Sequence, residues 1–333
     1  MPADLAEVYV FTGLHINEML ENTFPTTGIR VPSLPKTATV REWVNQAWLN
    51  VLLSSRKTDI YHKTLYCKWD PPAKAKLIIT LHDLATARFP ELFKGIDPDT
   101  AIKRYWANRA DAILAVSETT RRDAIEILGV SPDKIAVTRL GVRQQEPTLL
   151  QKSVSPHERP FLLYVGMRYD YKNFNNLVKA YAQSAATRTA FDLICFGGGK
   201  FSYNEKSLFL HSGTEGCIHF RSGNDAALLH YYLHARALVL PSRHEGFGLP
   251  LLEAMNAGCP LLCSDIPTTR EVAGNAAAYF PALEVDAISA IFDKVLFDEE
   301  LLAKNVALGR ERVKTFSWRR CAAETAAVYR SVI

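Results

Sequence analysis

The sequence predicts an α/β fold with two doubly wound domains. Short apolar runs, such as residues 76–81 and 237–240, alternate along the whole chain with longer amphipathic segments. An apolar run bounded by turn residues is typical of a buried parallel strand, and regular alternation of strands and helices is typical of a doubly wound sheet. The length of 333 residues exceeds one ordinary domain, so two domains are expected.

The first half of the chain contains one such series. We expect strands at residues 8–12, 59–62, 76–81, 112–116 and 135–140, and helices at residues 40–54, 99–110 and 117–130. Ser117 can cap the third helix. Residues 25–39 are rich in Pro, Thr and Ser and are predicted to be irregular. Residues 144–159 break the alternation with mixed polar residues, Pro147 and Pro156, and therefore predict a linker.

A second series follows the linker. We expect strands at residues 161–166, 191–196, 218–220, 237–240 and 260–263, and helices ending near residue 184, at residues 226–235 and 250–257, and from residue 269. The domains are therefore residues 1–150 and 160–316. Residues 317–333 form a further helix, which we expect to pack back on the first domain.

Charge and composition argue against nucleic-acid binding and leave membrane contact open. The net charge of +4 is small, and basic residues are not interleaved with aromatic ones, so nucleic-acid binding is not expected. A group of four lysines forms either a patch for peripheral membrane contact or an ordinary solvated face. These are Lys63, Lys68, Lys74 and Lys76.

The sequence also indicates the cellular compartment. No apolar run approaches the roughly 18 residues that span a bilayer, and acidic residues near the start argue against a secretory signal. The six cysteines form no C-x-x-C pair and no metal-ligand spacing, so we expect reduced thiols. A cytoplasmic location, with the inner face of the membrane as a peripheral site, is the expectation.

The stretch ALVLPSRHEGFGLPLLEAMNAGCP, residues 237–260, carries the clearest chemistry. It predicts a strand ended by Pro241, a glycine-bearing loop and a helix closed by Gly258. The carboxyl edge of an open parallel sheet is where ligands bind. Glu245 and Glu253 would lie there beside the free N–H groups of a helix start, an arrangement suited to the hydroxyls and phosphates of a nucleotide-sugar. The alternative is two solvated surface acids.

Two further elements place charged residues at the same kind of edge. Arg168 and Lys172 lie in the loop after the strand FLLYVG, where two cations would stabilise a departing nucleoside diphosphate. His82 directly follows the strand KLIITL in the first domain. Taken alone, the loop pair slightly favours solvated side chains, and a lone His is usually a hydrogen-bonded structural residue.

Residues 245–265, EGFGLPLLEAMNAGCPLLCSD, resemble the E-x7-E region of the large GT-B nucleotide-sugar glycosyltransferase family numbered four. VGMRYDYKN and LHDLATARFPELF resemble two other stretches of that family, and the resemblance spans about residues 59–330. It implies the GT-B fold, in which two Rossmann-like domains face each other across a cleft. The first domain would lie on the acceptor side, and the second would bind the nucleotide-sugar.

The resemblance also implies roles for single residues. Arg168 and Lys172 would hold the donor diphosphate, Glu245 the hydroxyls of the transferred sugar, Glu253 the ribose, and His82 the donor sugar from across the cleft. The backbone N–H groups of Gly246, Phe247, Gly248 and Leu249 would face the sugar and the phosphates, with the Phe247 side chain as a loop anchor. Gly197 and Arg221 would flank the nucleotide base.

Other motifs are excluded as sites. FGGGK at residues 196–200 lacks both the G-x-G-x-x-G and the Walker spacing, so neither NAD nor ATP is expected. Asp97 and Asp99 form a D-x-D at a helix start, which we interpret as a cap. We therefore predict no catalytic metal and no cofactor. The chain also lacks the glycine pair of the family's first loop, so its first βα unit is either missing or built differently.

The sequence thus predicts a metal-independent glycosyltransferase that moves a sugar to a hydroxyl of a carbohydrate or lipid-linked acceptor, and the resemblance implies that it retains the anomeric configuration. Mannose from GDP-mannose is favoured, because DIYHKTLY and the HDL stretch resemble mannosyltransferases of surface polysaccharide or glycolipid assembly. Two alternatives remain open. One is a nucleotide-sugar epimerase of the same fold, and the other is a non-catalytic subunit that binds the nucleotide-sugar.

Overall fold

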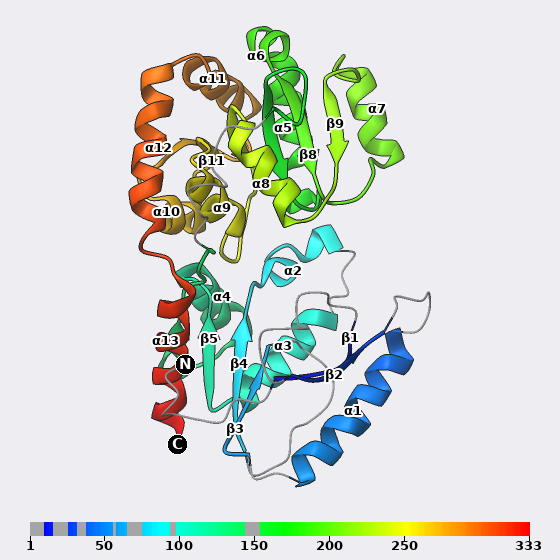
Figure 1. The fold of residues 1–333 in the computed structure, drawn as a ribbon, viewed down its shortest axis with the longest axis vertical. Helices are drawn as coiled ribbons and strands as arrows, with labels where there is room; N and C mark the ends of the chain where they lie inside the picture. The colour runs from blue at the N-terminus through cyan, green and yellow to red at the C-terminus, as the bar shows by residue number, and fades with distance from the viewer. Residues whose placement is uncertain are drawn as a thin grey trace.

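A computed structural model describes residues 10–15, 26–31, 38–55, 58–64, 75–93, 98–143 and 154–333 of the chain. These residues form two α/β lobes, one above the other in Figure 1, each built on a parallel sheet. The last helix, α13 (Trp318–Val332), leaves the C-terminal lobe and runs along the N-terminal one.

The C-terminal lobe contains a six-stranded sheet of order β12-β11-β10-β7-β8-β9, with every neighbouring pair parallel. Its strands are β7 (Phe161–Val165), β8 (Asp192–Phe196), β9 (Ile218–Arg221), β10 (Ala237–Leu240), β11 (Leu261–Ser264) and β12 (Ala277–Phe280). The order grows outward from β7 in both directions, which is the doubly wound arrangement that the sequence predicts. The strand order reverses between β7 and β10, and the carboxyl ends of the strands at such a reversal are where doubly wound sheets bind ligands.

Helices cover both faces of this sheet because successive strand side chains alternate in direction. Leu163 joins one core cluster with residues of α8, α9 and α10, whereas Leu162 joins another with residues of α5, α7 and α11. The helices are α5 (Phe174–Gln183), α6 (Ala185–Ala190), α7 (Tyr203–His211), α8 (Asp225–His234), α9 (Leu249–Ala257), α10 (Pro267–Ala273), α11 (Val285–Val295) and α12 (Glu299–Val313).

The N-terminal lobe contains a four-stranded parallel sheet of order β3-β4-β5-β6. Its strands are β3 (Ile60–Lys63), β4 (Lys76–Leu81), β5 (Ala112–Ala115) and β6 (Ile135–Val137). The helical segments are α1 (Ala38–Ser55), α2 (Ala85–Arg88), η1 (Pro90–Phe93), α3 (Pro98–Arg109), α4 (Glu118–Leu128) and η2 (Pro132–Lys134). As predicted, Ser117 caps α4: its Oγ accepts from the Thr120 N–H at 3.0 Å.

The first residues differ from the sequence prediction. β1 (Val10–His15) and β2 (Thr26–Arg30) form a separate two-stranded parallel sheet. The prediction that residues 25–39 are irregular is therefore wrong for β2 and for the first residues of α1. Turn-forming residue types dominate this stretch locally, but pairing with β1 supplies the backbone hydrogen bonds that make β2 a strand.

Neither alternative for the four lysines, a membrane patch or a solvated face, holds for Lys63. Lys63 is 3% exposed, and its Nζ lies 3.8 Å from the centre of the Trp106 ring. Lys76 is exposed and forms an ion pair with Asp111 at 3.1 Å. Lys68, Lys74, Asp97 and most of the predicted linker lie outside the described residues. A buried ammonium stacked on indole contributes nothing to a membrane-facing surface.

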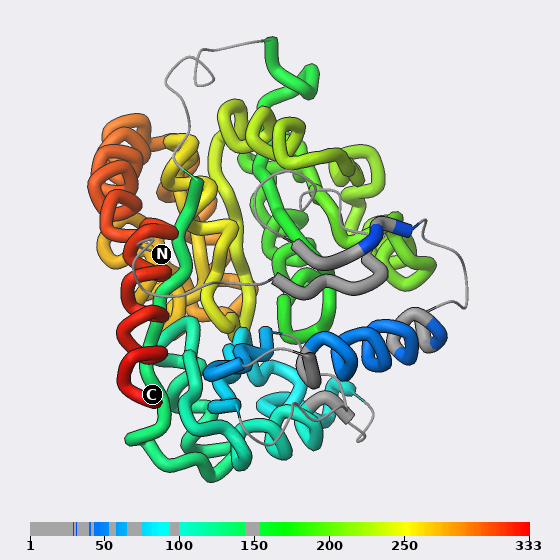
Figure 2. The backbone as a smooth tube through the Cα atoms, turned by 60° about the horizontal axis from the view of Figure 1, so that its bottom comes forward, coloured from blue at the N-terminus to red at the C-terminus, as the bar shows by residue number. Residues whose placement is uncertain are grey.

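Helix α13 packs on the N-terminal sheet. Val328, Tyr329 and Val332 contact the cluster of Ile78, Ala112 and Leu114. Figure 2 shows the same helix against the N-terminal half of the molecule from a second direction. Where α13 begins, the two chain segments that connect the lobes lie against each other: a Cβ added to Gly141 would lie 2.1 Å from the Trp318 backbone nitrogen. Among the described residues, none of the helices has the length and apolar character to cross a membrane.

Candidate functional site

Two loops of the C-terminal sheet meet at its carboxyl edge. One follows β7 and the other follows β10. The Arg243 N–H donates to the Tyr171 carbonyl at 2.8 Å, and the Asn173 side-chain amide donates to the Pro241 carbonyl at 3.0 Å. Asn173 holds a left-handed conformation, with φ of 61°, which Asn tolerates better than most residues. These bonds fix the two loops against each other.

The joined loops bring Lys172 and Glu245 together. Lys172 Nζ donates to both carboxylate oxygens of Glu245 at 2.8 Å. Ser242 Oγ also donates to Glu245 Oε1 at 2.6 Å. The Glu245 side chain is 9% exposed and the Lys172 side chain 21%. The two residues therefore form a largely buried ion pair at the carboxyl ends of β7 and β10, and they are not two solvated charges. The sequence analysis did not identify Ser242 as a site residue, although it lies three residues before Glu245 in the same loop.

Arg168 has different partners from Lys172. Its Nε forms an ion pair with Glu205, and its guanidinium donates to the carbonyls of Gly197 at 3.1 Å and Gly199 at 2.8 Å. The side chain is 4% exposed. Arg168 therefore holds the glycine-rich loop after β8. The two cations that were predicted together lie in one loop, but the structure does not bring their charges to one point.

The base-side residues lie at the ends of neighbouring strands. The Gly197 N–H donates to the Arg221 carbonyl at 2.9 Å, and Gly197 has φ of 80°. The Arg221 guanidinium donates to the Phe220 carbonyl at 2.9 Å. Gly197 thus continues the β8–β9 ladder before the loop turns back toward Arg168.

Glu253 lies on α9 and has a partner of its own. Tyr232 Oη donates to Glu253 Oε2 at 2.9 Å. Burial raises the pKa of Glu253, although the Tyr232 hydrogen bond opposes this shift. Burial and the nearby Glu253 carboxylate raise the pKa of Tyr232. The two acids of the E-x7-E motif therefore occupy distinct environments, one paired with a cation and one with a phenol.

Gly246 lies against the N-terminal domain. A Cβ at this position would lie 2.0 Å from the His82 carbonyl oxygen and 2.8 Å from the Asp83 Cβ. The Gly246 carbonyl accepts hydrogen bonds from Ser117 Oγ at 2.5 Å and Thr120 Oγ1 at 3.1 Å. Here the glycine permits close contact between the domains. His82 is exposed and directly follows β4, which ends at Leu81.

The rest of the loop leads into α9. Phe247 is 4% exposed, and its ring centre lies 6.0 Å from that of Phe316. Gly248 has φ of 89°, and no side chain caps the start of α9 at Leu249. Pro250 has no N–H, and the Leu251 N–H donates to the Gly248 carbonyl at 2.9 Å, so the Leu249 N–H is the group at this helix start that can face an anion.

Aromatic residues link the two domains beside the ion pair. Phe89 stacks on Tyr171 with ring centres 6.3 Å apart, and Phe93 lies 6.0 Å from the same ring. The Arg243 guanidinium lies 4.6 Å from the centre of the Phe89 ring. The sequence analysis missed these contacts because they join segments that are distant along the chain.

Two cavities flank this region. One of about 230 Å³ lies between the domains, behind the loop that carries Glu245, and includes Arg88, Asp123 and His244. His244 Nε2 lies 3.1 Å from Asp123 Oδ2. The other, of about 540 Å³, lies beside Arg168 and Gly198. Among the described residues that line these cavities, neither set includes Lys172 or Glu245.

Comparison with known proteins gives concordant matches in both halves. The family model described as Glycosyl transferases group 1 matches residues 145–312, and the model described as Glycosyltransferase Family 4 matches residues 3–146. The chain is 30% identical over 298 residues to an O-antigen chain mannosyltransferase B of Escherichia coli, covering 86% of this chain and 77% of that protein.

Two further likenesses extend the comparison. An MMP alpha-(1->4)-mannosyltransferase of Mycolicibacterium hassiacum is 28% identical over 235 residues, covering 68% of this chain and 56% of that protein. The solved structure of a sucrose-phosphate synthase from Thermosynechococcus elongatus superimposes with a TM-score of 0.77 at 18% identity, covering 97% of this chain and 88% of that one. The structural likeness bears on the fold alone. Together with the two family models, the matches show that the chain belongs to family 4 of the GT-B glycosyltransferases.

Proposed function

We propose that the protein transfers mannose, with retention of configuration, from a nucleoside-diphosphate mannose to a hydroxyl of a carbohydrate or lipid-linked acceptor. GDP is the favoured nucleotide, and surface polysaccharide or glycolipid assembly is the favoured process. The mannosyltransferase names of two similar proteins support the sugar. The observation that carries the chemistry is the Lys172–Glu245 pair, 2.8 Å apart at the carboxyl edge of the sheet.

The ion pair suggests how a donor is received. In the free protein the Glu245 carboxylate holds the Lys172 ammonium in place. A diphosphate carries more negative charge than a carboxylate and draws the ammonium toward itself. Glu245, still bonded to Ser242, then has lone pairs free for sugar hydroxyls. The Leu249 N–H, at the uncapped start of α9, faces the same ligand.

Transfer breaks the bond between the sugar anomeric carbon and the diphosphate oxygen. Negative charge grows on that oxygen, and Lys172 stabilises it. The acceptor oxygen forms the new bond on the face that the diphosphate leaves, and its proton passes to the departing diphosphate. The products are the glycoside and the nucleoside diphosphate. In this proposal Lys172 supplies the positive charge at the leaving group, and no metal ion takes part in the step.

A donor screen tests the proposal. Calorimetric titration with GDP-mannose, UDP-glucose and dTDP-rhamnose should give tightest binding for GDP-mannose, and equal affinities would overturn the donor assignment. Mass spectrometry of reactions with a hydroxyl acceptor should show GDP release and a mannosylated product. Epimerised sugar nucleotide formed without any acceptor would instead identify an epimerase, and tight binding without turnover would identify a binding subunit. Turnover unchanged by a chelator is expected.

The proposed location rests on the cysteines and on the acceptor. Free cysteines are typical of the cytoplasm, and a lipid-linked acceptor would lie at the inner face of the membrane, so we propose that the protein acts in the cytoplasm at or near that face. Cys195, Cys259 and Cys263 are buried and free. Cell fractionation of the full chain, with and without high salt, measures the membrane-bound share.

A further inference from the structure

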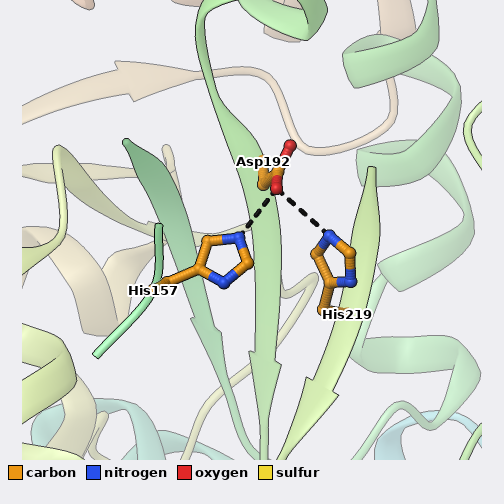
Figure 3. Close-up of side chains that lie close together, drawn as sticks. All are labelled: His157, Asp192 and His219. Carbon is orange, nitrogen blue, oxygen red and sulfur yellow. Dashed lines mark hydrogen bonds and ion pairs between the residues drawn. The ribbon is translucent and has the colours of Figure 1, made fainter. Parts of the chain in front are cut away.

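A second cluster of polar side chains lies away from the site described above. His157, Asp192 and His219 converge at the amino ends of β8 and β9 (Figure 3). His157 Nε2 lies 2.7 Å from Asp192 Oδ2, and His219 Nε2 lies 3.1 Å from the same oxygen. The glycine-rich loop begins at the other end of β8, so this cluster and the Lys172–Glu245 pair lie at opposite edges of the sheet.

The three side chains differ in their access to solvent. The Asp192 side chain is 4% exposed, that of His157 11% and that of His219 28%. Asp192 Oδ1 accepts from the Arg159 guanidinium at 2.6 Å. The carboxylate is thus held from one side by arginine, whereas its other oxygen faces two imidazole nitrogens and an opening to solvent beside His219.

This convergence has the donor atoms of a transition-metal site. Two imidazole nitrogens and one carboxylate oxygen lie within 4.8 Å of one another. Zn²⁺ prefers such nitrogen and oxygen ligands, at about 2.0–2.2 Å. A hydrogen-bonding partner that fixes a ligating carboxylate is a common outer-shell feature, and Arg159 occupies that position.

We propose that His157, Asp192 and His219 bind a divalent transition-metal ion, Zn²⁺ by preference, with water as the remaining ligand. The ion replaces the two imidazole–carboxylate hydrogen bonds with three coordination bonds. The competing interpretation is a buried carboxylate satisfied by three hydrogen-bond donors, with no affinity for metal.

The position of the ligands indicates a structural role. His157 belongs to the segment by which the chain enters the C-terminal domain, while Asp192 and His219 belong to adjacent strands. An ion bound to all three would tie the end of the linker to the sheet. Because the site is at the edge opposite Lys172 and Glu245, metal is expected to change thermal stability while leaving sugar transfer at low temperature unchanged.

The test uses the full chain, freed of metal with a chelator and then titrated with Zn²⁺ by calorimetry. We expect saturable binding of one ion per chain and a rise in Tm. His157→Gln and His219→Gln should each weaken binding at least about 10-fold. His211→Gln is the matched control, since His211 is exposed on α7 and bonds the Ser207 carbonyl at 2.7 Å. His234→Gln tests the other histidine pair, because His230 and His234 stack on α8.

Three results would overturn the proposal: no saturable binding by the wild-type chain, undiminished binding in both ligand variants, or loss of binding in His234→Gln. If the ligand variants fail to fold, X-ray absorption on the zinc-loaded wild-type chain still decides. Two imidazole nitrogens at about 2.0–2.1 Å are expected, and a zinc ion without imidazole ligands would contradict the site.

Discussion

At the residue scale, the Lys172–Glu245 pair joins one cation and one acid of the predicted site in a single contact. Arg168 and Lys172 are four residues apart in the loop after β7, but this spacing does not make their roles alike. The role of each cation depends on the acid that it contacts. Lys172 reaches Glu245, whereas Arg168 reaches Glu205 and the carbonyls of the loop after β8. Two cations that look equivalent in the sequence are therefore expected to have unequal effects when removed.

Replacing Lys172 by Ala should lower kcat/KM for sugar transfer about 10²- to 10³-fold, because a preorganised group facing the leaving oxygen is lost. The variant leaves Glu245 with Ser242 alone, so a stability loss of about 1–3 kcal/mol is expected. Steady-state kinetics and thermal unfolding measure the two effects. Lys294→Ala on α11, exposed and remote, is the matched control. Wild-type turnover in the Lys172 variant would remove its assigned role.

Glu253→Gln should separate stability from binding. Because burial raises the pKa of Glu253 above its ordinary value of 4.5, the folded state holds this proton more tightly than the unfolded chain. The stabilisation is present below pH 4.5 and is lost as the pH rises through the folded-state pKa. The glutamine variant should therefore melt higher than wild type at pH 7, with the difference vanishing in acid.

The same variant should bind the donor about 10- to 100-fold more weakly, since a hydrogen bond to a charged group is worth about 1.5–3 kcal/mol. Calorimetry with the nucleotide-sugar measures this loss. Glu300→Gln on α12, at an exposed position, should change neither property. Unchanged donor affinity in Glu253→Gln would exclude its proposed contact with the ribose.

At the scale of elements, the loop between β10 and α9 has two roles. One side presents Glu245 to the crevice, and the other docks on β4 and α4 through Gly246. The loop is thus held by the second domain that it must face during transfer. The Gly246 carbonyl couples the loop to the N-terminal domain, together with the contacts of His244 with Asp123 and of Arg243 with Phe89.

Gly246→Ala tests this coupling. The new Cβ would lie 2.0 Å from the His82 carbonyl oxygen, so the loop must move or the domains must separate. We expect a destabilisation of about 1–3 kcal/mol and a fall in kcat larger than the change in donor affinity. Gly216→Ala is the control, because a Cβ there meets nothing within 4 Å. Equal behaviour of the two variants would show that the interdomain contact is dispensable.

At the scale of the whole molecule, α13 makes the C-terminal end of the chain part of the N-terminal domain. Tyr329 Oη lies 2.6 Å from His62 Nδ1, and Thr80 Oγ1 lies 2.8 Å from His62 Nε2. The two domains are consequently joined by two crossings of the chain as well as by contacts across the cleft. Unfolding of one domain is expected to expose the core of the other.

This arrangement predicts acid sensitivity. Burial, with a contribution from His82, lowers the pKa of His62 from 6.5 to about 4. The unfolded chain therefore takes up this proton at a higher pH than the folded protein does. The stabilisation is present above pH 6.5 and is lost as the pH falls toward 4, by about 3 kcal/mol. Urea unfolding across this range should show a smaller loss in His62→Gln than in wild type, with His211→Gln behaving as wild type.

Much of the fold could be predicted from local sequence. The strands 76–81 and 237–240 were located to the residue, because apolar runs ended by turn residues permit no other placement. The cap at Ser117 and the closing glycine of α9 were likewise local signals. β2 was missed because its strand conformation depends on pairing with β1, and propensity alone does not report a partner.

The sequence predicted where the site residues lie in the fold, but it did not predict which side chains they contact. The sequence by itself determined that Lys172 and Glu245 lie at the carboxyl edge of one sheet, since each follows a strand, and that Glu253 lies one turn into the helix after Glu245. Only the tertiary structure decided that Lys172 binds Glu245, that Glu253 binds Tyr232, and that Gly246 meets His82. Such pairs join distant segments, and their distances depend on how whole strands and helices pack, which no local pattern of residues encodes.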